Sequence, residues 1–273
     1  MKTTLKKSLG IAALLALSAN PVLAHRFWII PSTSVLSGEN QWVTIDAAIS
    51  NNLFFPNHVS APLEAMTVTG PDGKPVEIQN GKQGKLRTTF DIELTQPGSY
   101  KIATVREMFS AQWKEGAEVK RWRGPVADFA KQELKGKPEL KVFENHSRVE
   151  TVVTSGEPSN VALKPTGKGL ELVIGDNHPN DLYAGEKATF TLHLNGAPAA
   201  NAKITLVKGD DRYRNEPGET VITTDAKGAF QVSFSEAGRY WLNATQETEG
   251  GNFEGVPLGR RVSYTTTFEV LPE

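Results

Sequence analysis

The stretch that decides the fold is Gln96-Pro97-Gly98-Ser99-Tyr100-Lys101-Ile102-Ala103, which recurs 140 residues later as Glu236-Ala237-Gly238-Arg239-Tyr240-Trp241-Leu242-Asn243. A second pair of segments repeats in the same order. Ser37-Gly38-Glu39-Asn40 precedes a strand-like run at 42–47, and Ala184-Gly185-Glu186-Lys187 precedes another at 188–194. Because both signals keep their order and nearly their spacing, the chain is expected to contain one kind of domain twice.

The runs between these signals alternate as half-buried strands do. Phe190, Leu192 and Leu194 fall on one face of an extended chain, and the threonines between them fall on the other. Turn signals interrupt the runs at 71–73, 81–84, 195–196 and 225–228. We therefore predict an all-β fold with two immunoglobulin-like β-sandwich domains in tandem. The Gly-x-Tyr element resembles the tyrosine corner of such domains, although an ordinary buried aromatic is the alternative.

The first 24 residues have the pattern of an export signal. Lys2, Lys6 and Lys7 supply a basic start, residues 9–19 are apolar, and Val22-Leu23-Ala24 matches the small-residue cleavage pattern. Cleavage after Ala24 would make His25 the new N-terminus. We therefore expect an exported, periplasmic protein that begins at His25.

The rest of the chain divides into two domains and an insertion. An N-terminal β-sandwich domain that carries the expected metal site is predicted over 25–157, and a C-terminal immunoglobulin-like β-sandwich domain over 160–273. The link between them is expected at 155–159. Residues 106–147 break the strand pattern. Within them, Pro125 and the apolar positions after it predict one short helix near the end of the first domain.

Composition excludes several classes of function. Without residues 1–24 the chain carries 27 basic and 31 acidic side chains, a balance that favours neither nucleic acid nor an anionic membrane surface. It has no cysteine, so any metal site must use nitrogen and oxygen donors. No second apolar stretch approaches about 18 residues, so no membrane insertion is expected after signal cleavage.

His25 is the first candidate metal ligand. A free α-amine and the Nδ1 atom of the same residue can close one chelate ring on a metal ion. The third mature residue is Phe27 and not the histidine that the flexible amino-terminal copper and nickel motif needs at that place. A further ligand must therefore come from elsewhere in the fold. Alternation sends Phe27 and Ile29 to one face and Trp28 and Ile30 to the other, which would hold the chain end on both faces. The alternative is that the signal merely happens to end before a histidine.

Four further histidines compete for the second ligand position. His58 ends the aromatic, Asn-rich loop 51–58, which favours it, although it is otherwise an ordinary loop histidine. His178 lies in a polar turn with Asp176 and Asp181, a weaker candidate site because turn chemistry explains the same composition. His193, on the polar face of a strand, and His146 have no partner that the sequence identifies.

Other chemistries have little support. Nucleophile elbows, phosphate loops, dinucleotide fingerprints and His-Glu-x-x-His motifs are missing from the sequence, so no catalytic residues are predicted. The pair Asp210-Asp211 is expected at the surface beside Arg212 and Arg214. The basic segment Lys120-Arg121-Trp122-Arg123 is a candidate for holding an anion or a partner, or else a solvated face.

Segments along the whole mature chain carry a family resemblance. The chain resembles exported proteins of the NikM-like domain-of-unknown-function family, whose members are described as periplasmic components of cobalt or nickel uptake. The resemblance implies immunoglobulin-like β domains and divalent-metal handling, with the family's histidines at His25 and His58. The segments that carry it are 24–31, 36–47, the loop ending in His58, 96–100, 120–124, 260–264 and 270–272.

Three functions remain open on this basis. The leading hypothesis is a non-enzymatic periplasmic protein that binds nickel or cobalt through His25 and His58, associated with a metal-uptake transporter or an outer-membrane receptor. The usual order of divalent-metal affinities for nitrogen donors would by itself favour copper. The second hypothesis is therefore a copper histidine brace, used for copper handling or for oxidative polysaccharide cleavage. The third is an interaction module without metal. The distance between His25 and His58 in the fold discriminates between these hypotheses, because one mononuclear metal site cannot use two histidines more than about 10 Å apart.

Overall fold

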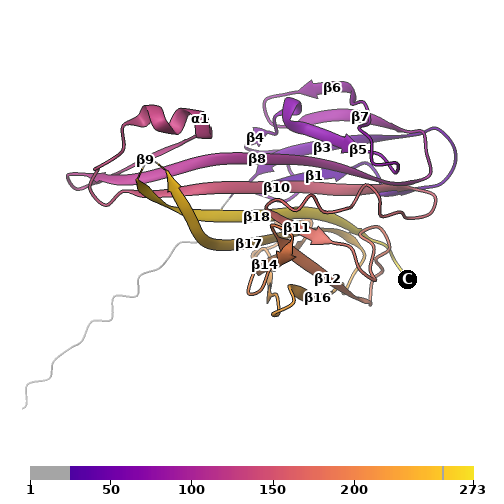
Figure 1. Cartoon of the computed structure of the whole chain (residues 1–273). Helices are drawn as coiled ribbons and strands as arrows, with labels where there is room; N and C mark the ends of the chain where they lie inside the picture. Colours follow the sequence, from indigo (N-terminus) through magenta and orange to yellow (C-terminus); the bar gives the residue numbers. More distant parts are fainter. Residues whose placement is uncertain (1–24, 254) are drawn as a thin grey trace, which may run out of the picture.

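The computed structural model describes residues 25–253 and 255–273 and shows three layers of β-sheet (Figure 1). The predicted signal peptide, residues 1–24, lies outside the described residues. The first sheet has the order β1-β3-β7-β6, with β4 paired to β3. These strands are β1 (Arg26–Pro31), β3 (Gln41–Ser50), β4 (Val59–Ser60), β6 (Gln79–Gln83) and β7 (Thr88–Leu94).

The central sheet is the largest layer and has nine strands. Its order is β15-β14-β17-β18-β10-β8-β5, with β2 paired to β10 and β9 paired to β8. These strands are β2 (Val35–Leu36), β5 (Met66–Thr69), β8 (Gly98–Glu115), β9 (Glu118–Gly124), β10 (Lys141–Ser155), β14 (Lys203–Lys208), β15 (Thr220–Thr223), β17 (Gly238–Phe253) and β18 (Val256–Val270).

The third sheet covers the other side of the central one. It has the order β11-β12-β13, with β16 paired to β12. These strands are β11 (Leu170–Val173), β12 (Lys187–Leu194), β13 (Ala197–Pro198) and β16 (Ala229–Ser233). The alternation predicted for β12 is confirmed, because Phe190 and Leu192 are buried and Thr189 is exposed.

Two hydrophobic cores lie on opposite faces of the central sheet. One gathers residues between Ile29 and Val153, and the other gathers residues between Leu170 and Val270. In the register of β10 with β18, Arg148 is opposite Tyr264, so Tyr264 faces away from Val149 of the first core. Each half is thus a β-sandwich, and the predicted all-β class is confirmed.

The sequence did not predict that the two sandwiches share a sheet. Strand β10 closes the first half and β18 closes the second, and the two pair in parallel from Val142↔Leu258 to Thr151↔Thr267. Each would otherwise expose a row of unpaired backbone groups, which the pairing satisfies. The fusion makes the two halves one continuous structure.

The repeated Gly-x-Tyr element forms the same bond twice. The Tyr100 hydroxyl donates to the Gln96 carbonyl at 2.8 Å, and the Tyr240 hydroxyl donates to the Glu236 carbonyl at 2.8 Å. The glycine before each tyrosine has a positive φ, +121° at Gly98 and +136° at Gly238. The tyrosine corner predicted by analogy is therefore present in both halves.

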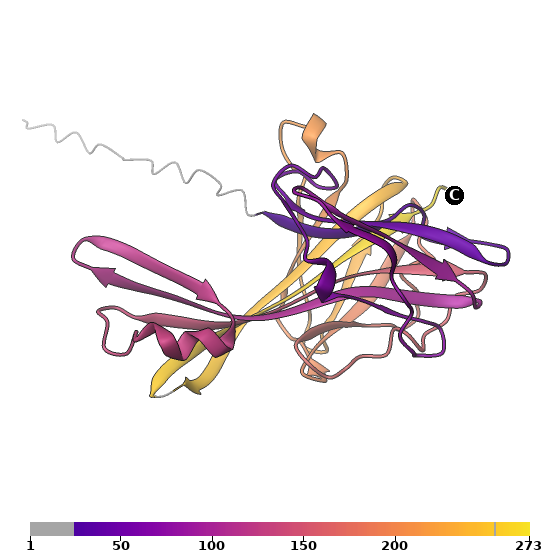
Figure 2. The same ribbon diagram turned by 90° about the horizontal axis from the view of Figure 1, so that it is seen from above.

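Strands β8, β9, β10, β17 and β18 extend past the sandwiches as a projection that we call the arm, residues 106–147, 246–253 and 255–261 (Figures 1 and 2). The predicted short helix is α1 (Val126–Phe129), with Pro125 at its N-cap, continued by the 3-10 turn Ala130–Gln132. Its Phe129 ring packs at 5.0 Å from Phe109 and 5.1 Å from Phe253. The arm thus has a small core of its own.

The tyrosine corner at Tyr100 has one hydrogen bond more than the corner at Tyr240, so the stability effects of removing the two hydroxyls can be compared. The Tyr100 hydroxyl also accepts a hydrogen bond from the Gln96 N–H at 2.8 Å. We expect Tyr100→Phe to cost about 2 kcal/mol of unfolding free energy and Tyr240→Phe about 1 kcal/mol, because they remove two bonds and one respectively. Urea denaturation of the two variants measures this, and a larger loss for Tyr240→Phe would contradict it.

Candidate metal site at the start of strand β1

Strand β1 lies between two hydrophobic clusters. Ile29 belongs to the first core, with Phe27 packed against it, and Trp28 and Ile30 belong to a separate cluster with Val207 and Trp241 of the second half. The alternation predicted for this segment is confirmed. Trp28 Nε1 also donates to Ser50 Oγ at 2.7 Å, and Trp241 Nε1 donates to the Phe27 carbonyl at 2.9 Å. The backbone next to His25 is therefore held on both faces.

Arg26 adds a buried ionic anchor beside His25. Its guanidinium donates to Asp211 at 2.5 Å and to Glu219 at 2.8 Å, and only 7% of the residue is exposed. Both carboxylates belong to the second half of the chain. A buried arginine needs such partners, since an unpaired charge there would be costly.

Asp211 corrects one of our predictions. The pair Asp210-Asp211 was expected at the surface, and Asp210 is exposed, but Asp211 is 6% exposed. Asp210 has a left-handed backbone, φ +63°, at the start of the 3-10 turn Asp211–Tyr213. That turn directs the second carboxylate inward to Arg26, a contact across 185 residues of sequence that local composition does not reveal.

The loop that carries His58 is also held by the Asp211 carboxylate. Asp211 Oδ1 accepts the N–H of Leu53 at 2.9 Å. Within the loop, Asn57 Oδ1 accepts the N–H of Asn51 at 2.9 Å, and Asn57 Nδ2 donates to Asn52 Oδ1 at 2.8 Å. The asparagines thus serve the loop's own shape, and Asp211 joins that loop to β1.

This scaffold brings His25 and His58 into contact. Their rings are stacked, with centroids 3.7 Å apart and planes 4° apart, and both residues are exposed. Strand β3 explains the meeting, because Arg26 pairs with Ser50 on one side of β3 and Val59 pairs with Ile49 on the other. Within residues 25–253 and 255–273, no cluster of three or more His, Asp or Glu side chains forms a metal cage.

The weaker candidates are placed elsewhere. His178 is buried, its Nδ1 accepts the N–H of Asn180 at 3.1 Å, and its Nε2 lies 3.1 Å from Ser99 Oγ. Both ring nitrogens are therefore used in structural bonds, and burial lowers the pKa of His178 below its ordinary value. Asp176 is exposed in the same turn.

The remaining histidines have structural surroundings. His146 is buried against Gly169, with its Nε2 3.7 Å from Glu107 Oε1, and burial lowers its pKa. His193 is half-buried on β12. Of the five histidines, the two that the sequence favoured are the two that touch each other.

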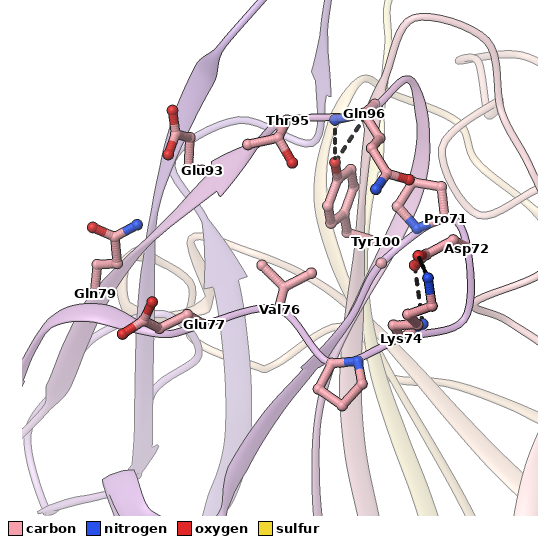
Figure 3. A pocket seen from close by; sticks show the side chains of 12 residues that line it. Pro71, Asp72, Lys74, Val76, Glu77, Gln79, Glu93, Thr95, Gln96 and Tyr100 are labelled. Atoms are coloured by element: carbon pink, nitrogen blue, oxygen red, sulfur yellow. Dashed lines mark hydrogen bonds and ion pairs between the residues drawn. The ribbon is translucent and has the colours of Figure 1, made fainter.

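A hollow of about 300 Å³ lies near the other end of the first sheet (Figure 3). Strand β3 begins there, where Gln41 pairs with Leu94, and ends beside Arg26. Two pairs of polar residues at the hollow are bonded within the pair, and the side chains of Glu77, Gln79 and Glu93 also line it (Figure 3). Asp72 accepts the Lys74 N–H and pairs with its ammonium, contacts that lower the pKa of the carboxyl, and the Tyr100 hydroxyl is bonded to Gln96.

Comparison with protein families decides the classification. A family model described as a domain of unknown function, DUF4198, matches residues 22–248. The chain belongs to this family. The DUF4198 match includes β1, the His58 loop and most of both sandwiches. A comparison with curated proteins finds no match.

Solved structures provide only distant likenesses. A DUF4785 family protein from Legionella pneumophila is 10% identical, with a TM-score of 0.24, over 79% of this chain and 50% of that one. The chain thus spans about half of that protein. The D0-D1 domain of intimin (10% identity, 86% and 96% covered) and the human OSCAR ligand-binding domain (12%, 88% and 98%) each have a TM-score of 0.20. These scores are too low to relate the DUF4198 chain to any one of them.

Over residues 25–253 and 255–273, no helix of the DUF4198 chain is both long and apolar enough to cross a bilayer.

The ionic anchor is open to a direct test. Asp211→Asn keeps the shape of the side chain but leaves Arg26 with Glu219 as its single carboxylate partner. We expect a loss of about 3 kcal/mol in the free energy of unfolding, because one partner of a buried pair is neutralised. Asp210→Asn, at the exposed neighbour, is the matched control and should change stability by less than about 0.5 kcal/mol. Equal effects of the two variants in urea denaturation would refute the anchor.

His178 predicts a dependence of stability on pH. Because its pKa is lowered in the folded protein, the unfolded chain binds the proton more readily, and the free energy of unfolding falls as pH drops through the ordinary histidine range near 6.5. His178→Asn should reduce this fall between about pH 7 and 5. His193→Asn is the control and should retain it. An unchanged slope in His178→Asn would contradict the assignment.

Proposed function

We propose that this DUF4198 protein binds a first-row divalent metal ion through His25 and His58, as a binding protein and not as an enzyme. The observation that supports this most directly is the stacked pair of exposed imidazoles, 3.7 Å apart, on two separately anchored segments. Two exposed histidines from residues 33 positions apart have no structural need to meet. A metal ion gives that meeting a use.

The donor set suits a borderline metal. If export cleavage follows Ala24, the α-amine and Nδ1 of His25 provide two nitrogens and His58 provides a third. Two nitrogens that each lie about 2.0 to 2.1 Å from one metal are themselves about 3 to 4 Å apart. The ring centroids of His25 and His58 are 3.7 Å apart, which places the two imidazoles within reach of a single ion once the stacked rings turn. Because both side chains are exposed, their rings can rotate to direct the nitrogens at one ion.

The anchors fix the backbone segments that carry the two histidines, and the site leaves coordination positions that these histidines do not fill. The buried Arg26–Asp211 pair and the Leu53–Asp211 bond fix both segments to the same carboxylate. No third acidic or histidine side chain closes the pair within the described residues, so water or a partner's ligand would complete the coordination. Such an open site suits a protein that takes up a metal ion and transfers it.

The physiological setting follows from the resemblance to NikM-like proteins. We propose a periplasmic role in nickel or cobalt uptake, with the ion passed to a transporter or an outer-membrane receptor. Nitrogen donors bind Cu²⁺ more tightly than Ni²⁺ or Co²⁺, so selectivity would depend on metal supply. The copper-enzyme alternative needs an exposed aromatic platform, and Trp28 and Phe54 pack together in a cluster instead.

Isothermal titration with Ni²⁺, Co²⁺ and Cu²⁺ tests the proposal on protein that begins at His25. We expect a 1:1 complex that is weakened at least about tenfold by His58→Gln, because one of three protein donors is lost. An added alanine before His25 should weaken it similarly, because it moves the amine out of the chelate. His193→Gln is the matched control.

The outcomes separate the possibilities. Equal affinity of the native and the extended protein would remove the amine from the site. Equal affinity of the native protein and His58→Gln would remove the histidine pair altogether, and with it the proposed function.

A further inference from the structure

The arm has two different faces. On one face, Phe109, Phe129 and Val142 form its small core beneath α1. The other face carries the alternate residues of the same strands. There the register runs Arg106↔Ser147↔Ser263 in one row and Met108↔Asn145↔Arg261 in the next, and Arg123 of β9 is opposite Ser110. These rows together place three arginines and several hydroxyls on one face of four strands, β8, β9, β10 and β18.

A cavity of about 320 Å³ opens on this second face at the base of the arm. Arg106, Arg123, Arg261, Ser147 and Ser263 are among the residues that line it. A neighbouring hollow of about 360 Å³ shares Arg123 and Arg261 and adds Arg121. Cavities of this size hold small molecules.

The positive charges at the cavity are only partly balanced. Arg261 donates from Nε to Glu247, which also lines the cavity, at 2.8 Å, and its guanidinium lies 3.5 Å from the centre of the Phe143 ring. Arg106, Arg121 and Arg123 form no ion pair with any carboxylate of the described residues. The cavity therefore has more arginines than counter-charges.

Arg106 is the most informative of these side chains. It is half-buried, and its single polar contact in the described structure is Nη2 to Met108 Sδ at 3.7 Å. Burial, together with the charge of Arg123, lowers the pKa of Arg106. An anion between the two guanidiniums would relieve both costs and would accept their hydrogen bonds in the geometry that arginine favours.

Neutral donors complete the lining. The hydroxyls of Ser147 and Ser263 are half-buried beside the arginines and form no hydrogen bond with the described part of the chain. Asn145 is already committed, since its Nδ2 donates to Ser110 Oγ at 2.9 Å and to the Phe143 carbonyl at 3.0 Å. Two free hydroxyls and two unpaired guanidiniums form a set of donors directed at oxygen anions.

We propose that this cavity is a binding site for a small molecule with two or more anionic groups, carboxylate or phosphate. Arg106 and Arg123 bind the anionic groups, and Ser147 and Ser263 donate to the remaining oxygens. A cavity of about 320 Å³ favours a small molecule over an acidic protein segment, which would need an extended groove. The site is separate from the His25–His58 pair and does not depend on the proposed metal function.

Titration of the metal-free protein at low salt with citrate and with pyrophosphate tests the site, and the two probes distinguish carboxylate from phosphate. We expect one of them to bind at least about tenfold more tightly than acetate, because two anionic groups engage two arginines. Binding should weaken as salt is raised.

Variants locate the binding. Arg106→Gln and Arg123→Gln should each lower the affinity for the preferred probe by about tenfold. Arg87→Gln is the matched control, because it removes the same charge from an exposed ion pair with Asp46 of the first sheet. Arg87→Gln and His58→Gln should each change the affinity for the preferred probe by less than about twofold. Arg123 is exposed, so its variant should fold even if that of half-buried Arg106 does not.

Equal affinity of the native protein and Arg123→Gln would overturn the proposal. So would binding of acetate as tight as that of citrate and pyrophosphate, or binding of polyglutamate with neither small anion bound.

Discussion

The parallel pairing of β10 with β18 is the constraint on which the rest of the structure depends. It joins the last strand of each half along ten residue pairs, from Val142↔Leu258 to Thr151↔Thr267. With that pairing in place, two sandwiches share one central sheet and their cores occupy its opposite faces. Residues of the second half are thereby brought beside the first sheet, where Val207 and Trp241 meet Trp28.

Both candidate sites follow from this geometry. The histidine pair exists because β1 lies between the two halves and because Asp211 of the second half holds both Arg26 and the His58 loop. The arginine-lined cavity exists because β8 and β9 of the first half continue into the same sheet as β17 and β18 of the second, with the arm's core on the other face. Each site therefore depends on residues from both halves of the chain, the histidine pair through the support of Asp211 and the cavity through its own lining.

Sequence reasoning succeeded where the physics is local. The two-residue period of β1 and β12, the Gly-x-Tyr turns and the helix after Pro125 depend on neighbours within a few positions, and the structure has all of them. It failed for Asp211, whose burial depends on a partner 185 residues away. Composition beside Arg212 and Arg214 resembles a surface, and only the fold reveals that one carboxylate turns inward.

The sequence by itself determined the β-strand pattern, the internal repeat and the choice of His25 and His58, because residue type and spacing carry that information. Only the tertiary structure decided that the two rings touch, that the halves merge through one sheet, and that Arg106 and Arg123 face a shared cavity. The physical reason is that strand partners, and the face a side chain presents to a distant strand, are set by long-range backbone hydrogen bonding. No local pattern records that bonding.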